Sequence, residues 1–446
     1  MRRQLLAPSE PFRGCLRYGC AGLSSLAFLA GASAQIAPPP GPLDFSGQAQ
    51  GLQAQPSGAQ VQPSGAQVQP SGPVTTSVLA PPSMAPLPEQ PLLQWGPVGF
   101  YPHFLYRFLY GDGVPAQPGE HFATAINEVY PGILLKLGQH WQLDYTPSLR
   151  YYSSSHFQDT TDHSVALNGG TTYENWTFGL SQRYATTSQP LIETGAQTDL
   201  ETYDTAINAA CQFNTKTSLE MGFNQGFQYV DQNASSGPLT DSKVWSTMDW
   251  LNYQFWPKLG AALGVGGGYA DLSLGSSMSY EQLKGRITWQ AGDKVSVSAS
   301  GGLDDRQFVD STQPDLLNPI FTVSAFYRPF EATTLSLDAS RTVSPSYFEG
   351  LVTETTAVGG GLHQRFFKKL NLDFSTGYGV TSYELTSPGP NPLREDHFTY
   401  VNVRLSVPFL KRGTAGVFYQ ASKNTSTVST YQISSTQVGF DLAYHF

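Results

Sequence analysis

The sequence predicts an all-β protein: a transmembrane antiparallel up-and-down β-barrel of about 18 strands, with 16 as the alternative. Three observations lead to this fold class. Apolar and polar residues alternate in segment after segment, the connections alternate between short and long, and tryptophans gather beside the short connections. Only 13% of the residues are charged and another 13% are aromatic, as expected where one strand face meets lipid and the other meets water.

Residues 1–34 have the features of a secretory signal peptide. A basic leader precedes an apolar core at residues 21–31, which is too short to span a bilayer as a helix. Ala32-Ser33-Ala34 then provides a small-residue cleavage site. No other stretch approaches the length of a helical span, so we expect no membrane-spanning helix.

Charge and cysteine content exclude several classes of protein. The chain has 25 basic and 34 acidic residues, and removing four Arg and one Glu with the signal leaves 21 against 33, a net charge of −12. Such a charge is unfavourable for binding nucleic acid. Cys211 is the only cysteine outside the signal peptide. We therefore expect no disulfide framework and no cysteine-rich metal site, and no cofactor is predicted.

Residues 35–97 form a predicted disordered periplasmic linker, rich in Pro, Gln, Ser and Gly. The unit QPSGAQV repeats from Gln55 to Val68. A seven-residue period is typical of coiled coils, but a Pro and a Gly in every unit are incompatible with a continuous helix. A flexible tether is the favoured interpretation, and a docking segment for peptidoglycan or a periplasmic partner is the alternative.

The outer-membrane barrel is predicted over residues 98–446. In its third strand, Trp141, Leu143 and Tyr145 share one face, whereas the polar residues between them share the other. The seventh and eleventh strands alternate as clearly, while the second and eighth are ambiguous in face. Strands are expected near residues 99–110, 121–137, 141–152, 163–173, 175–186, 200–213, 217–230, 243–256, 259–272, 279–291, 294–308, 319–330, 333–344, 352–367, 370–384, 396–410, 413–423 and 431–446.

The connections between these strands fix the direction of the chain. Short connections alternate with longer polar ones, as in outer-membrane barrels, which have short periplasmic turns and longer outer loops. The linker and the C-terminus are therefore both expected in the periplasm, and the strand count must be even. The longer connections include residues 111–120, 153–162, 187–199, 231–242, 309–318, 385–395 and 424–430.

Aromatic residues predict where the membrane interfaces lie. An indole ring is apolar but its N–H needs a polar partner, so tryptophan favours the interface. Four tryptophans close to short connections indicate an inner girdle: Trp141, Trp176, Trp256 and Trp289. Four tyrosines toward the opposite strand ends are candidates for an outer girdle: Tyr151, Tyr184, Tyr229 and Tyr383.

The last ten residues resemble the terminal assembly signal of bacterial outer-membrane barrels. Val438, Phe440, Leu442, Tyr444 and Phe446 alternate with small or polar residues. The resemblance rests on a Gly, the alternating apolar residues and the final Phe, which makes Gly439, Leu442, Tyr444 and Phe446 the candidate signal. As the closing strand, this segment should pair with residues 99–110, with Asp441 and His445 facing the lumen.

Longer stretches extend the resemblance to a family. The stretches PHFLYRFLYGDGV (102–114) and NEVYPGILLKLGQHWQLDYTPSLRYYSSS (127–155), with the closing VGFDLAYHF, resemble the β-barrel porin families of poorly characterised Gram-negative outer-membrane proteins. The resemblance covers roughly residues 98–446 and implies a barrel in the outer membrane. The expected partners are outer-membrane lipid, lipopolysaccharide and the barrel-assembly machinery. Whether the protein forms a homo-oligomer stays open.

Sequence motifs for catalysis are missing, and the protein is not expected to be an enzyme. There is no Gly-x-Ser-x-Gly elbow, His-x-x-x-His pair or phosphate loop. Asp304-Asp305 and Asp396-His397 are the best candidates for an outer-rim protease site. Because adjacent strand residues point to opposite faces, neither pair can converge on one lumenal spot without a bulge.

Charged residues on the predicted inner faces are candidates for lining the lumen. Each would cost roughly 2–4 kcal/mol at mid-depth in lipid, so each should point inward. The favoured interpretation is a mutually neutralising network, and the sharper alternative is a selectivity constriction. Acidic residues of the outer loops, including Glu193, are interpreted as a solvated rim, with weak binding of divalent ions as the alternative. The lumen candidates are Arg150, Arg183, Lys284, Arg286, Arg306, Arg328, Arg404, Asp144, Glu220, Asp338 and Asp373.

These observations predict a porin-like channel for passive passage of small hydrophilic solutes. Barrels of 16 to 18 strands leave an aqueous channel unless something fills it. No predicted outer loop exceeds about 15 residues and no plug domain precedes the barrel. The alternative is a non-enzymatic structural or export-accessory barrel, for example one serving surface polysaccharide export.

Overall fold

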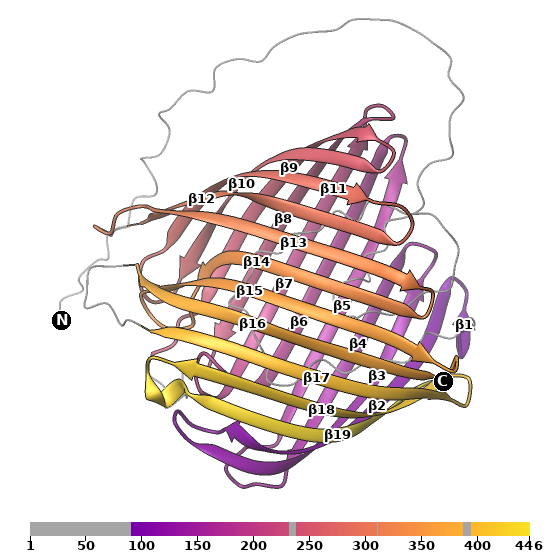
Figure 1. Ribbon diagram of the computed structural model, residues 1–446, viewed down its shortest axis with the longest axis vertical. Helices are drawn as coiled ribbons and strands as arrows, with labels where there is room; N and C mark the ends of the chain where they lie inside the picture. Colours follow the sequence, from indigo (N-terminus) through magenta and orange to yellow (C-terminus); the bar gives the residue numbers. More distant parts are fainter. Residues whose placement is uncertain (1–90, 232–237, 310, 387–393) are drawn as a thin grey trace, which may run out of the picture. The chain divides into compact units, whose positions relative to one another are not determined.

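The structure is a computed structural model of the 446-residue chain, and it describes residues 91–231, 238–309, 311–386 and 394–446. The predicted signal peptide at 1–34 lies outside the described residues, as does the predicted linker up to residue 90. The described chain is almost entirely β-strand (Figure 1). No helix in the described ranges is long and apolar enough to cross a bilayer.

The strands follow one another along the chain with a single 3-10 turn between the last two. Their bounds are β1 Leu93–Trp95, β2 Val98–Pro115, β3 His121–Leu137, β4 Trp141–Tyr152, β5 Thr160–Tyr173, β6 Trp176–Leu191, β7 Ala196–Gln212, β8 Thr217–Val230, β9 Ser242–Trp256, β10 Leu259–Leu272, β11 Met278–Gln290, β12 Val295–Phe308, β13 Leu316–Phe330, β14 Thr333–Pro345, β15 Leu351–Phe366, β16 Leu370–Leu385, β17 Glu395–Phe409, β18 Gly413–Ser426, η1 Ser429–Tyr431 and β19 Ile433–His445.

The sheet closes on itself through strands β2 to β19. Each strand pairs antiparallel with its neighbour in sequence, and β19 pairs with β2 from Thr436↔Asp112 to His445↔His103. This closure confirms the predicted fold class, the count of 18 strands and the pairing of the last strand with residues 99–110. Closure also leaves no open edge in the wall, which is what a spanning sheet requires in lipid.

Strand β1 is an addition that the sequence analysis did not foresee, because residues 93–95 lie inside the segment assigned to the linker. It pairs with the start of β2, from Leu93↔Phe100 to Trp95↔Val98. At these positions β2 extends beyond the end of β19, whose last pair is at His103. The free edge of β2 supplies backbone hydrogen-bonding groups, and three residues are enough to use them.

The outer face of the barrel is apolar. Val265, Leu283 and Leu303 lie side by side on β10, β11 and β12, and each is at least half exposed. Trp141, Trp256 and Trp289 are likewise exposed near the short turns. The prediction that Tyr383 belongs to the outer girdle is wrong. Tyr383 is buried inside the barrel, where its hydroxyl donates to Asp396. Odd-numbered residues of β16 face inward there, and Tyr378 instead occupies the outer face.

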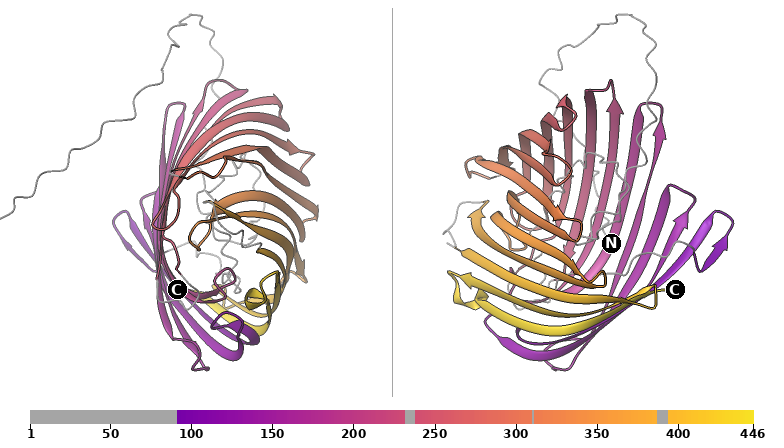
Figure 2. Two further views of the ribbon diagram at one scale, coloured as in Figure 1. Left: turned by 90° about the vertical axis from the view of Figure 1, so that its left-hand side faces the viewer. Right: turned by 45° about the vertical axis from the view of Figure 1, so that its right-hand side comes forward.

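The two ends of the barrel differ in their connections, and we name them the short-turn end and the long-loop end. On the long-loop side the strands run further than predicted, so that only residues 192–195 connect β6 to β7, in place of the expected loop 187–199. Polar residues there continue the ladder because strand pairing depends on backbone groups. Connecting segments also lie inside the ring of strands in the left view of Figure 2.

Candidate functional site in the lumen

Side-chain contacts that skip over intervening strands identify the inner surface of the barrel. Arg286 on β11 donates to Glu220 on β8 at 2.8 Å, with β9 and β10 lying between them. Such contacts can form only on the concave side of a curved sheet. Arg286 also donates to Asn252 at 2.6 Å and lies over the Trp250 ring, both on β9, so this predicted lumen cation links β11 to β8 and β9.

The most deeply buried predicted residue, Arg150, lies at the centre of an ion-pair network. Its Nε donates to Glu128 at 2.8 Å, and its Nη1 lies 3.5 Å from Asp162. Arg107 approaches the same Glu128 carboxylate at 3.8 Å. Both Arg150 and Glu128 are 1% exposed at their side chains, so these opposite charges compensate one another inside strands β2 to β5.

A second network lies near the short-turn end. Arg404 donates through Nη2 and Nε to Asp441 at 2.6 and 3.0 Å, and its Nη1 is 3.8 Å from Asp373. Asp373 in turn contacts His363 at 2.7 Å. The row therefore connects β15, β16, β17 and β19 across the part of the wall next to the closing seam.

The remaining predicted lumen residues differ in whether they form an ion pair. Asp144 contacts His103 at 3.2 Å, and Arg306 donates to Asp304 at 2.6 Å. Lys284 is buried on β11, on the same side as Arg286. Within the described residues, four candidates have no ion-pair partner within 4 Å: Arg183, Lys284, Arg328 and Asp338.

Two members of the Arg150 network, Glu128 and Arg107, are not among the predicted residues, and a third, Asp162, is predicted in the solvated rim but is buried beside Arg150. Glu128 lies on the second strand, whose face was ambiguous because apolar residues occupy both of its sides. Arg107 lies on β2, where the buried residues alternate as His103, Leu105, Arg107 and Leu109. That period-two pattern was the available signal, but leucines on the inner face obscured it.

Segments from opposite walls meet at the long-loop end. Glu193, which follows β6, accepts hydrogen bonds from the Ser346 hydroxyl at 2.5 Å and the Tyr347 backbone N–H at 2.9 Å, just before β15. Strands β6 and β15 are nine strands apart in either direction around the ring, so they are diametrically opposite. This contact therefore crosses the lumen. The sequence predicts Glu193 in a solvated rim, and its partly buried position against the opposite wall corrects that prediction.

The residues around Tyr347 make further contacts across the mouth. The Tyr347 hydroxyl accepts from Gln228 at 2.7 Å, and its carbonyl accepts from the Thr240 N–H at 2.8 Å. Leu239 forms an isolated β-bridge with Phe348 and packs in an apolar cluster with Tyr347. We call residues 346–348 with Glu193, Gln228, Leu239, Thr240 and Arg394 the cross-lumen cluster.

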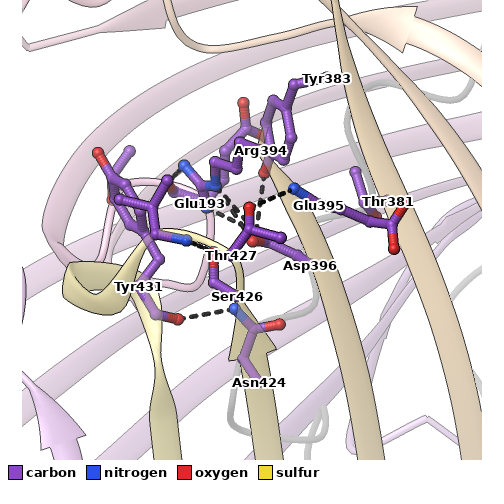
Figure 3. Close-up of polar contacts among 12 residues, drawn as sticks. Glu193, Thr381, Tyr383, Arg394, Glu395, Asp396, Asn424, Ser426, Thr427 and Tyr431 are labelled. Carbon is purple, nitrogen blue, oxygen red and sulfur yellow. Dashed lines mark hydrogen bonds and ion pairs between the residues drawn. The ribbon is translucent and has the colours of Figure 1, made fainter. Parts of the chain in front are cut away.

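Arg394 completes this cluster from the β16–β17 connection. Its Nη1 donates to the Glu193 backbone carbonyl at 2.9 Å, and its Nη2 donates to Asp396 at 2.6 Å. The guanidinium carbon lies 3.5 Å from the centre of the Tyr431 ring and 4.4 Å from that of Tyr383. Figure 3 shows this arrangement, in which one cation is held by two aromatic rings and a carboxylate.

Burial perturbs the ionisable groups of the cluster. It raises the pKa of the Glu193 carboxyl above its ordinary value, although the hydrogen bonds from Ser346 and Tyr347 act in the opposite direction. Burial, reinforced by the neighbouring Glu193 charge, also raises the pKa of the Tyr347 hydroxyl. For Arg394, burial alone would lower the pKa, but the hydrogen bond to Asp396 and the nearby Tyr383, Asp396 and Glu193 side chains together outweigh it, and the pKa is raised.

Beneath the cluster lies a cavity of about 230 Å³, whose lining comes from both walls. Leu191, Ile192 and Glu193 contribute from the β6 side, and residues of β14 to β18 contribute from the other. The catalytic candidates do not combine here, because Asp396 lines the cavity while the neighbouring His397 contacts Tyr378 on the outer face. Within the described ranges, no group of three or more His, Cys, Asp or Glu could hold a metal ion.

A closed antiparallel barrel of 18 strands, apolar outside and lined by charged side chains inside, is the architecture of outer-membrane porin-type barrels. This class is the one that the family resemblance implied. Solved structures similar to this chain include Pseudomonas aeruginosa OpdL (12% identity, TM-score 0.40), Acinetobacter baumannii OccAB2 (10%, 0.44) and P. aeruginosa OccK2 (OpdF) in complex with glucuronate (11%, 0.43). Each comparison covers 78% of this chain and 98% of the other. No family model and no curated protein matches the sequence.

Proposed function

We propose that this protein is an outer-membrane channel through which small hydrophilic solutes pass passively, without a catalytic step. The observation that carries the proposal is the charged inner surface of a closed 18-stranded barrel. A barrel of this size is wide enough for an aqueous lumen. In the described residues, buried apolar side chains form four small clusters rather than one continuous core, which leaves the inside to polar groups and water.

The candidate lumen-lining residues have two roles in this proposal. Paired charges such as Arg286–Glu220 and Arg404–Asp441 hold neighbouring strands together while staying neutral as sets. Charges without such a partner, such as Arg183 and Asp338, act on the permeating solute and set ion selectivity. The cross-lumen cluster narrows the path at the long-loop end.

The proposal includes a placement in the cell, which the apolar outer face of the barrel supports. The linker and the C-terminus lie in the periplasm, and the apolar outer face contacts lipid and lipopolysaccharide. Gly439, Leu442, Tyr444 and Phe446 present the assembly signal on β19 to the barrel-assembly machinery. Leu442 and Phe446 are accessible on the outer surface, at 39% and 46% exposure. A homo-oligomer would bury part of this face and would migrate as such after mild detergent extraction.

Conductance in planar bilayers tests the proposal. The purified full-length protein is refolded, and folding is checked by the heat-dependent change of its mobility in gels. Stepwise ion currents in potassium chloride are the expected result. Correctly folded protein that inserts into the bilayer without any current would overturn the proposal.

A further inference from the structure

One row of residues on the cavity wall has a carboxylate at one end and a phenol at the other, with two glycines between them. Asp338 on β14 pairs with Gly359 on β15, Gly359 pairs with Gly377 on β16, and Gly377 pairs with Tyr400 on β17. Cross-strand partners lie on the same face of a sheet. The four residues therefore form a straight row across four strands, in which the two central positions carry no side chain.

Both flanking side chains lean over the glycines. A Cβ atom at Gly359 would lie 2.6 Å from the Asp338 Oδ2, and a Cβ at Gly377 would lie 2.5 Å from Tyr400 Cε1 and 2.9 Å from its hydroxyl oxygen. The carboxylate and the phenolic oxygen thus stand over neighbouring strands. Adjacent strands are separated by about 5 Å, so one ammonium or guanidinium group between the two oxygens could donate a separate N–H to each.

The charge of the Asp338 carboxylate is not balanced by the protein. Within the described residues it makes no hydrogen bond and no ion pair, and none of the residues that line the cavity is a Lys or an Arg. The two other acidic residues of the cavity are already engaged. Asp396 is bound by Arg394, and Glu193 accepts from Ser346 and Tyr347.

The other residues that line the cavity are suited to binding a small polar organic molecule. Phe398 packs beside Tyr400 with 6.0 Å between the ring centres. The hydroxyls of Thr355 and Thr381 contact one another at 3.1 Å on the adjoining wall. A volume of about 230 Å³ accommodates a short aliphatic chain. An aromatic face next to a carboxylate attracts ammonium and guanidinium groups through both electrostatics and cation–π contact.

We propose that Asp338 and Tyr400 form a binding site for small organic amines, in which the cationic group lies over Gly359 and Gly377. The inference deepens the proposed channel function, because it names the class of solute that the cavity selects. The permeating amine would exchange water in the gap for the carboxylate and the phenol. Solutes that carry only negative charge would be repelled by Asp338.

Calorimetric titration of the full-length protein in detergent with agmatine tests the site. The wild type should bind agmatine and should not bind succinate. Asp338→Asn should weaken agmatine binding about tenfold or more, since a charge-assisted hydrogen bond is lost. Tyr400→Phe should weaken it less, because the ring remains. Asp204→Asn removes another lumen carboxylate, on β7 opposite Arg183, and should leave binding within about twofold because Asp204 is not among the residues that line the cavity.

A second variant tests the geometry rather than the charge. In Gly359→Ala, the added methyl group displaces the Asp338 carboxylate from its place over β15, so binding should weaken although no charge changes. Equal affinity in wild type and Asp338→Asn, or binding of succinate as tight as that of agmatine, would overturn the inference. Because the readout is binding, it is independent of conductance: an electrically silent protein that still binds agmatine refutes the channel and leaves the site standing.

Discussion

Charged and polar side chains connect strands at both the short-turn end and the long-loop end of the barrel, but the connected strands are much farther apart around the ring at the long-loop end. Near the short-turn end, the ion pairs join strands at most three positions apart, as in Arg286–Glu220 and Arg404–Asp441. At the long-loop end, the contact of Glu193 with Ser346 joins strands nine positions apart. The first kind of contact holds the wall in its curvature, whereas the second occupies the mouth. Polar contacts in one barrel therefore serve two purposes that substitution can separate.

The largest expected effect is loss of stability when the Arg404 contact is broken. Asp441 is 5% exposed at its side chain and depends on the Arg404 guanidinium for two hydrogen bonds. Arg404→Ala leaves an uncompensated buried carboxylate, so the free energy of unfolding should fall by about 3 kcal/mol. Urea unfolding in lipid vesicles measures this change. Conductance of the folded fraction should be close to that of the wild type.

A matched control is available on the opposite side of the barrel. Arg183 is also a lumen-facing arginine, but it is exposed to solvent and has no ion-pair partner within 4 Å in the described part of the chain. Arg183→Ala should therefore change the unfolding free energy by less than about 0.5 kcal/mol. Equal destabilisation by the two substitutions would refute the assignment of Arg404 to the wall.

The wall of the barrel could be predicted from sequence, and the reason is periodicity. Alternation in residues 141–151 identified the inner face of β4 because strand side chains alternate with a period of two. Short and long connections alternate along the chain and place both ends of the barrel on the same side, which predicts an even number of strands. Face assignment was ambiguous on β3, where apolar residues lie on both sides, and Glu128 was missed for that reason.

The cross-lumen cluster could not be predicted, because its residues are brought together only by the closed ring. Glu193 and Tyr347 are 154 positions apart, and each lies in a connection of a few residues. Neither connection is long enough to be read as a plug. The row from Asp338 to Tyr400 was equally hidden, since it requires the exact register of three strand pairs. Asp338 alone was recognised as a lumen candidate.

The next largest effect concerns conductance at the long-loop end. Tyr347 is 3% exposed and fills the centre of the cross-lumen cluster. Tyr347→Ala removes the ring and its hydrogen bond with Gln228, so the mouth should widen and single-channel conductance should rise roughly twofold or more, since conductance follows pore diameter. Tyr229→Ala is the control, because that ring lies on the outer face against Tyr203. An unchanged current in Tyr347→Ala would place the narrowest point elsewhere.

The smallest expected effect is a pH dependence that originates in Glu193. Its pKa is raised above 4.5 in the assembled cluster, so the assembled state binds the proton more tightly than an opened state in which water surrounds the carboxyl. Acidification through this range should therefore stabilise the cluster, and raising the pH should loosen it. Open-channel probability should increase from about pH 4.5 upward. The facing groups Tyr347 and Arg394 keep their charge states there, because burial of Tyr347 and the bond from Arg394 to Asp396 raise both pKa values.

In Glu193→Gln the side chain stays neutral, so this component of the pH response should disappear while responses due to other lumen carboxylates persist in both proteins. A variant that responds to pH as the wild type does would show that the charge of Glu193 does not control the mouth.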